Sequence, residues 1–284
     1  MIIDERGYHL HQSDIETFMQ CPEQLRLKHL AVGDATSDAA FVGTTTHAVI
    51  EHELMSPQPY GSLKEAINYG AYAFLEGMEQ LYANQTAYSR ETFKTDSKAL
   101  KALEPLVESW YVSPERDMLM SMDPNDYQVE WEFDKPFTVT PDGTTIWLAG
   151  RTDLVLRNRV WDWKTSSSEY KPWEKQRWAI QPTEYLWAAA TEGLILPNAD
   201  GEFVFEYKVL KRGAKPVKFQ TVTVKRTMGS FTWLERIVQN MVSFMEKMGF
   251  DTEWPLNDHS ALCGPKWCPF WAGCKGAYIG EDWT

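Results

Sequence analysis

Two periods of apolar residues divide the chain. Up to about residue 120, apolar side chains recur every three or four positions, which is typical of amphipathic helices. The first expected helix follows a cap at Ser13 and Asp14 and runs through residue 18, and Pro22 opens the next, to about residue 30. Further helices are expected over residues 41–55, 63–81 and 97–111. The N-terminal part is therefore predicted to be mainly helical.

From residue 127 the period changes to two, which indicates β-strands. Val129, Trp131 and Phe133 alternate with Glu130 and Glu132, so the two sets are expected on opposite faces of one strand. The turn sequence TPDGT precedes a strand expected over 146–150. The elements expected after it are a hairpin over 151–156 and 160–164, a helical stretch over 173–192 that Pro182 interrupts or restarts, strands over 203–210 and 218–224, and a helix over 231–248.

This alternation of helical and strand patterns places the chain in the α/β class. We expect a single folded unit over residues 1–284. It should have a mainly helical part over 1–120, a core with a mixed sheet flanked by helices over 121–250, and a cysteine-rich tail over 251–284. Glu130 and Glu132, on the strand before Gly150, are both candidates for a carboxylate of the functional site, and the sequence does not choose between them.

The predicted hairpin carries charged residues where apolar ones are expected. Asp162 and Lys164 are two positions apart and therefore share one face, and Asp153 lies opposite them within about one residue of register. Hard oxygen ligands of this kind suit Mg²⁺ or Mn²⁺, and the lysine can orient and polarise an attacking water. The alternative is a surface ladder of ion pairs across two strands.

Composition limits the classes of protein that the chain can belong to. With 43% hydrophobic residues it can bury a sizeable core, and no signal peptide or membrane span is visible, so we expect a soluble cytoplasmic protein. Four cysteines in that setting are more often ligands or free thiols than disulfides. The net charge of −12 argues against nucleic-acid binding by the whole surface.

One segment is basic despite the acidic total. Between positions 206 and 226 a single glutamate, Glu206, faces seven cations: Lys208, Lys211, Arg212, Lys215, Lys218, Lys225 and Arg226. Such a patch can hold a phosphate backbone, and Lys211, Arg212 and Lys215 are the candidates for DNA binding. The alternative is a solvated hairpin whose charges block aggregation.

The charged hairpin resembles a known nuclease core. Gly150-Arg151-Thr152-Asp153 and Asp162-Trp163-Lys164-Thr165 are similar to the G-x-x-D and (D/E)-x-K motifs of the PD-(D/E)XK nuclease superfamily. The stretch FVGTTTHAVIEHE resembles the G-x-x-x-H-x-x-x-E helix of its RecB-like branch. That resemblance implies that His47 joins Asp153 and Asp162 as a metal ligand, and an imidazole ligand tilts the preference toward Mn²⁺.

A further motif, QPTEY, resembles the Q-x-x-x-Y motif of the same branch. It implies that Gln181 contacts the phosphate or the nucleophilic water, and that Tyr185 contacts the DNA backbone or stacks on a base. Pro182 removes a backbone donor and should place Gln181 at or before the first turn of its helix. One or two of the thirteen tryptophans are also expected to stack on unpaired bases, although the sequence specifies none.

The cysteines resemble those of RecB-like enzymes that carry an iron–sulfur cluster. Cys21 lies in an N-terminal "CP" pair, and Cys263, Cys268 and Cys274 lie in the tail. The resemblance implies a 4Fe–4S cluster that joins the N- and C-terminal ends. Four thiolates suit zinc as well, and free thiols are the third alternative.

Taken together, the resemblance implies a restriction-endonuclease-like fold and a metal-dependent DNA nuclease. We expect an exonuclease of the phage or CRISPR-associated kind that hydrolyses single-stranded DNA or DNA ends. If the protein is encoded by a phage, it should act in the cytoplasm of the host. The resemblance is compatible with a helicase, a recombinase or a CRISPR-adaptation protein as partner, and with a homo-oligomer. The rival is an inactive DNA-binding adaptor or recombination partner that keeps the fold and the cluster.

Overall fold

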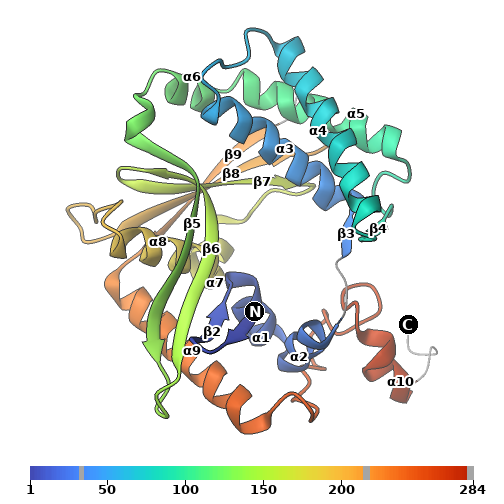
Figure 1. Ribbon diagram of the computed structural model, residues 1–284, viewed down its shortest axis with the longest axis vertical. Coiled ribbons are helices and arrows are strands. Elements are labelled where there is room, and N and C mark those ends of the chain that lie inside the picture. Colours follow the sequence, from blue (N-terminus) through green and yellow to red (C-terminus); the bar gives the residue numbers. More distant parts are fainter. Residues whose placement is uncertain (32–34, 214–217, 280–284) are drawn as a thin grey trace. The chain divides into compact units, whose positions relative to one another are not determined.

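The computed structural model describes residues 1–31, 35–213 and 218–279 and has a mixed α/β fold (Figure 1). Two compact units divide the chain, and each is assembled from segments far apart in the sequence. Unit 1 comprises Met1–Val32, Phe133–Gly150 and Phe231–Thr284, and unit 2 comprises Gly33–Glu132 and Arg151–Ser230. Strand β5 (Tyr127–Val139) and strand β6 (Thr145–Leu156) each give one part to unit 1 and the other to unit 2.

Unit 1 begins with a short hairpin that the sequence pattern does not predict, because its strands are too brief to show a period. Strands β1 (Ile2–Asp4) and β2 (Gly7–Leu10) are antiparallel, and β2 pairs in parallel with the first part of β6. Gly7 is required at the turn, because its φ is +127° and a Cβ there would collide with the carbonyl of Thr145. The helices of this unit are α1 (Gln12–Gln20), α2 (Pro22–Leu30), α9 (Met228–Met248) and α10 (Lys275–Ile279).

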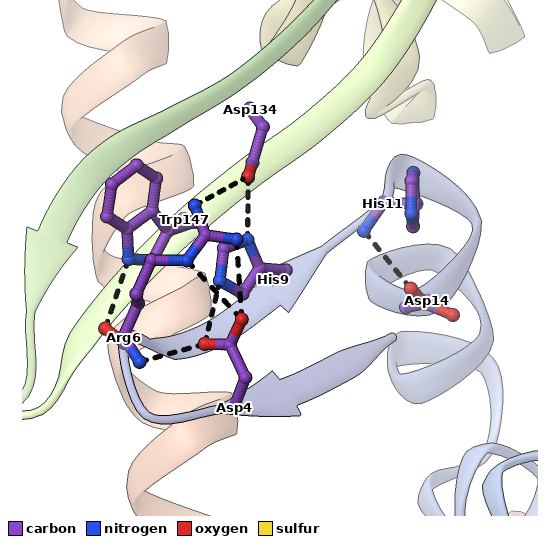
Figure 2. A network of polar contacts seen from close by, with 7 residues as sticks. All are labelled: Asp4, Arg6, His9, His11, Asp14, Asp134 and Trp147. Carbon is purple, nitrogen blue, oxygen red and sulfur yellow. Dashed lines mark hydrogen bonds and ion pairs between the residues drawn. The ribbon is translucent and has the colours of Figure 1, made fainter.

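A polar network fixes this hairpin to its neighbours (Figure 2). The His9 imidazole is 2% exposed, with Nδ1 2.6 Å from Asp134 Oδ1 and Nε2 3.2 Å from Asp4 Oδ1. Its ring stacks on Trp147, whose other neighbour is the Arg6 guanidinium, 5.0 Å from the indole centroid. A buried imidazole with a carboxylate at each nitrogen is a structural histidine.

Unit 2 contains the mixed sheet. Strand β7 (Arg159–Ser166) pairs antiparallel with β6 and parallel with β8 (Phe203–Lys211), and β8 pairs antiparallel with β9 (Lys218–Arg226). The helices α3 (Asp38–Met55), α4 (Leu63–Ala83) and α5 (Asp96–Tyr111) cover one face, and α8 (Gln181–Thr191) covers the other (Figure 1). The remaining elements are β3 (Ala35–Ser37), β4 (Ala87–Ser89), α6 (Pro114–Met120) and α7 (Pro172–Trp178).

The two faces of β7 have different chemistry. Trp161 and Trp163 are buried against α3, α4 and α5, and the Trp110 ring packs edge-on to Trp163 at 5.0 Å. Because side chains alternate along a strand, Asp162 and Lys164 point to the opposite face, toward α8. The predicted strands and helices of this region are therefore confirmed, with the helical stretch divided into α7 and α8. Pro182 lies in the first turn of α8, where a missing N–H costs nothing.

No helix in the described part of the chain is long and apolar enough to cross a membrane.

A buried charge pair holds the helices of unit 2 together. Glu53 on α3 accepts a hydrogen bond from Trp110 Nε1 at 2.8 Å, and its Oε1 lies 2.6 Å from Arg116 Nη2 on α6. Removing one partner of such a pair leaves the other buried and uncompensated.

We therefore expect Glu53→Ala to lower the free energy of unfolding by about 3–5 kcal/mol, measured by urea denaturation. The control is Glu104→Ala, since Glu104 is exposed on α5 and should change stability by about 0.5 kcal/mol or less. Equal stabilities of the two variants would mean that the pair contributes nothing net.

Candidate active site

The candidate site forms where β6 and β7 stop pairing. Their ladder runs from Leu156 and Arg159 to Leu154 and Trp161. Directly beyond it, Asp153 Oδ2 accepts a hydrogen bond of 2.5 Å from the backbone N–H of Trp163. The carboxylate of Asp153 thus accepts the hydrogen bond of a backbone N–H that a neighbouring strand would otherwise accept. Asp153 and Asp162 are the residues that face each other where the two strands separate.

Helix α3 brings His47 to this point. Gly43 lies one turn earlier, and a Cβ at that position would lie 2.8 Å from Thr165 Oγ1, so a larger residue there would force the Thr165 side chain or the helix to shift. His47 Nδ1 lies 3.5 Å from Asp153 Oδ2. Burial acts against both charges, but their mutual attraction outweighs it, so the pKa of His47 is raised and that of Asp153 is lowered.

Asp162 is held by two side chains. Its Oδ2 lies 2.5 Å from Lys164 Nζ, and its Oδ1 accepts a hydrogen bond of 2.8 Å from Gln181 Nε2. Burial raises the pKa of Asp162 to about 6, with a further contribution from the charge of Asp153, although Lys164 opposes the shift. The pKa of Lys164 is also raised, because the two carboxylates outweigh its burial. Lys164 is therefore an ammonium at every pH near neutrality and cannot accept a proton.

Glu130, and not Glu132, faces the site. Glu130 has a φ of +51°, which breaks the regular alternation of β5, and its Oε2 lies 2.7 Å from Arg151 Nε. Burial and the neighbouring Asp153 raise the pKa of Glu130 to about 7. Glu132 is exposed. The two glutamates therefore differ in their surroundings: Glu130 is half-buried and has a left-handed backbone, whereas Glu132 is exposed.

Gln181 and Tyr185 lie as neighbouring groups on α8. Gln181 is the first residue of the helix, which resolves its orientation toward Asp162. Tyr185 is only 7% exposed, its ring packs against Phe205 at 6.3 Å, and its hydroxyl interacts with the Gln181 side chain. Burial raises its pKa well above the usual range, so it stays neutral. An aromatic ring enclosed in this way is not available to stack on a base.

The basic segment of β8 and β9 is less exposed than its composition indicates. Lys208 is buried and ion-paired with Glu206 and Glu115, and Arg226 is buried as well. Lys211 Nζ lies 3.1 Å from Glu169 Oε1. Three of the seven cations, Lys208, Lys211 and Lys225, are therefore paired with carboxylates of the protein, and Lys215 lies outside the described residues.

Arg212 differs from these lysines. Its guanidinium lies beside the Phe93 ring, and burial lowers its pKa despite the charge of Asp38. Its Nε and Nη1 atoms are buried and have no hydrogen-bond partner among the described residues. A half-buried guanidinium with two unused nitrogen donors, Nε and Nη1, is suited to an anionic ligand.

The four cysteines belong to unit 1, and three of them, Cys21, Cys263 and Cys268, line one small cavity. Asn257 Nδ2 donates a hydrogen bond of 2.6 Å to the carbonyl of Gln20, which anchors the tail beside Cys21. Burial raises the pKa of Cys263 and of Cys274, and the other thiols raise it further. The thiols therefore lie close enough to interact electrostatically.

Both groups of side chains have the donor chemistry of metal sites. His47, Asp153 and Asp162 offer one nitrogen and several carboxylate oxygens, and the cysteines offer four sulfurs. Across residues 1–31, 35–213 and 218–279, however, no three His, Cys, Asp or Glu side chains stand together as a ready-made ion site. At the strand separation, His47 is paired with Asp153 and Lys164 with Asp162.

The sequence matches the PD-(D/E)XK nuclease superfamily over residues 9–275, and the chain belongs to this superfamily. Its members are generally DNA nucleases that use Mg²⁺ or Mn²⁺. No curated protein matches the chain. Among solved structures the chain is similar to SSO0001, with 14% identity, a TM-score of 0.31, and coverage of 93% of this chain and 94% of that chain. A likeness at that level supports no conclusion about either fold or activity.

The pKa values of Asp162 and Glu130 predict how cation binding depends on pH. Protons compete with a cation for these carboxylates below about pH 6 and about pH 7, respectively. We expect Mn²⁺ affinity, measured by calorimetry, to rise from about pH 5 to about pH 8 and then to level off. Lys164 adds no step, because it stays charged throughout. A Mn²⁺ affinity that does not change with pH would contradict the assignment of Asp162 and Glu130 to the cation site.

Two variants separate these titrations. Glu130→Gln should remove the part of the rise that Glu130 contributes around pH 7 and keep the part around pH 6 that comes from Asp162. His47, whose pKa is raised, titrates in both proteins and is therefore common to the two profiles. Glu132→Gln is the matched control on the same strand and should leave the whole profile unchanged, because Glu132 is exposed.

Proposed function

We propose that the protein is a metal-dependent DNA nuclease whose active centre is the strand separation between β6 and β7. The single observation that carries this proposal is the convergence there of Asp153, Asp162, Lys164 and His47, all buried or half-buried. Buried charges are costly, and a protein without use for them would be more stable with apolar residues. That argument also disfavours the rival function, an inactive adaptor.

A bound Mg²⁺ or Mn²⁺ would be held by Asp153, Asp162 and His47 and would activate water and stabilise charge on the phosphate. The protein's own residues supply the rest. Lys164, as a permanent ammonium, orients the attacking water and stabilises developing negative charge, but it does not remove the proton. Gln181 keeps Asp162 in position, and Tyr185 in turn keeps Gln181 in position.

DNA is the substrate in this proposal, and the protein acts as an exonuclease on single strands or on DNA ends. Arg212 supports a phosphate contact, because its two buried nitrogen donors need an acceptor. Lys211 and Lys215 are the further candidates from the sequence. We place the protein in the RecB-like branch, of the phage or CRISPR-associated kind that acts in the cytoplasm, with a helicase, a recombinase or the CRISPR-adaptation machinery as partner.

We also propose a 4Fe–4S cluster on Cys21, Cys263, Cys268 and Cys274. Three of these thiols line one cavity, and the electrostatic effect of the thiols on one another supports a shared site. A cluster there would link two segments separated by most of the sequence. Zinc remains the competing ion, because four thiolates suit both.

The test of the nuclease is Lys164→Ala. Removing the ammonium should reduce cleavage of labelled DNA with Mn²⁺ by at least on the order of 100- to 1,000-fold, while DNA binding changes little. The melting temperature should fall, because Asp162 loses its buried partner, so cleavage is measured well below the melting temperature of the variant. Lys98→Ala, an exposed lysine on α5, is the control and should cleave like the parent protein. Full activity in Lys164→Ala would exclude this centre.

The test of the cluster is Cys21→Ser. It should remove iron and sulfide from protein purified without air and lower the melting temperature. A cross-link over so long a loop stabilises by on the order of 4–5 kcal/mol if it acts like a disulfide. Cleavage should then follow the folded fraction. Lys164→Ala is the reciprocal control, since it should keep its iron and lose cleavage. One zinc and no iron in the parent protein would overturn the cluster but not the nuclease.

A further inference from the structure

Helix α7 exposes two tryptophans side by side. Trp173 and Trp178 are 55% and 58% exposed, and their ring centroids lie 5.2 Å apart at an interplanar angle of 69°. Trp110, Trp161 and Trp163 are almost completely buried, and the exposed Trp233 and Trp267 lie outside α7. Single exposed apolar residues are common on protein surfaces, but a pair of exposed indoles on one seven-residue helix indicates a binding surface.

Cations flank this pair. Lys171 Nζ lies 5.9 Å from the centroid of Trp173, and Arg177 Cζ lies 5.8 Å from that of Trp178. Glu174 is the one carboxylate within Pro172–Trp178, and Lys171 pairs with it at 2.8 Å. In a chain whose net charge is −12, a surface of indoles and cations is complementary to a polyanion that also carries flat rings.

The backbone of α7 is firmly held. Arg226 donates hydrogen bonds of 2.9 Å to the carbonyls of Gln176 and Ala179, and one of 2.7 Å to Thr183 Oγ1 at the start of α8. The Gln176 side chain makes two more hydrogen bonds, of 3.0 and 2.9 Å, with the backbone of Lys225 on β9. Ligand binding would therefore order little of the backbone, which removes part of the entropic cost.

The helix is also next to the candidate active site along the chain. Trp178 precedes Gln181 by three residues, so their Cα atoms are at most about 11 Å apart. Gln181 in turn contacts Asp162. A DNA strand whose base stacks on Trp178 can thus extend to the aspartates within very few nucleotides.

We propose that Trp173 and Trp178 form a stacking platform for unpaired bases of single-stranded DNA, which α7 guides into the site. This inference rests on the proposed nuclease function for the fate of the strand, but not for its binding. A duplex keeps its bases stacked internally and offers only phosphates to Lys171 and Arg177. The platform therefore selects single strands, because only unpaired bases can stack on an indole.

The experiment measures binding without cleavage, in EDTA, by fluorescence anisotropy of a labelled single strand and of the matching duplex. The Trp173→Ala/Trp178→Ala variant should bind the single strand on the order of 10- to 100-fold more weakly and the duplex as before. Its salt dependence should be unchanged, since no cation is removed. Quenching of intrinsic tryptophan fluorescence by the single strand should also be lost.

The matched control is Trp233→Ala/Trp267→Ala, which removes two indoles that are 45% and 58% exposed outside α7 and should bind both DNAs like the parent. Trp173→Phe/Trp178→Phe should keep most of the single-strand affinity, because phenyl rings still stack. Melting curves confirm that each variant is folded.

Unchanged single-strand affinity in the alanine variant would overturn the platform, and so would an equal loss for the duplex or a preference for RNA of the same sequence. Failure of the nuclease proposal has a different signature. In that case the parent protein cleaves no DNA with Mn²⁺, while the loss of single-strand binding in the alanine variant remains.

Discussion

The hydrogen bond from the Trp163 amide to the Asp153 carboxylate is the interaction on which the candidate site depends. It satisfies a strand donor with a side chain and so lets β6 and β7 separate without leaving a buried N–H unpaired. The separation brings Asp153 and Asp162 together and gives His47 access from α3. The tryptophans of β7 hold the opposite face rigidly against three helices, so the charged face is positioned by a packed core.

Burying two carboxylates side by side affects the stability of the fold, as their pKa values show. The pKa of Asp162 is raised in the folded protein, so its contribution to stability is present below the unfolded value of about 4 and is lost as the pH rises through about 6. The contribution of Asp153 to stability depends on pH in the opposite way. Its pKa is lowered, so it stabilises the fold above about pH 4, and this stabilisation is lost in acid. At neutral pH the fold keeps an unfavourable carboxylate beside a favourable one, as expected where two carboxylates serve chemistry.

Much of this could be predicted from the sequence, because it depends on local patterns. The period of two over β7 correctly places Asp162 and Lys164 on one face, and the position of Pro182 correctly places Gln181 at the start of α8. The rest depends on long-range packing. The left-handed backbone of Glu130 has no signal in the alternation, the enclosure of Tyr185 depends on Phe205, and the exposure of Trp173 and Trp178 depends on how α7 docks on β9.

The acidic composition then sets how DNA must be recognised. A net charge of −12 repels a polyanion at long range, although salt screens this beyond about 8 Å at physiological ionic strength. Lys208 and Arg226 cannot offset the repulsion, because both are buried within the protein. In the proposed mode of binding, affinity comes from short-range contacts that need no net positive charge, namely stacking on exposed indoles and cation binding at the aspartates. A duplex offers fewer of these contacts than a single strand, and this difference is the physical reason for proposing a single-stranded substrate.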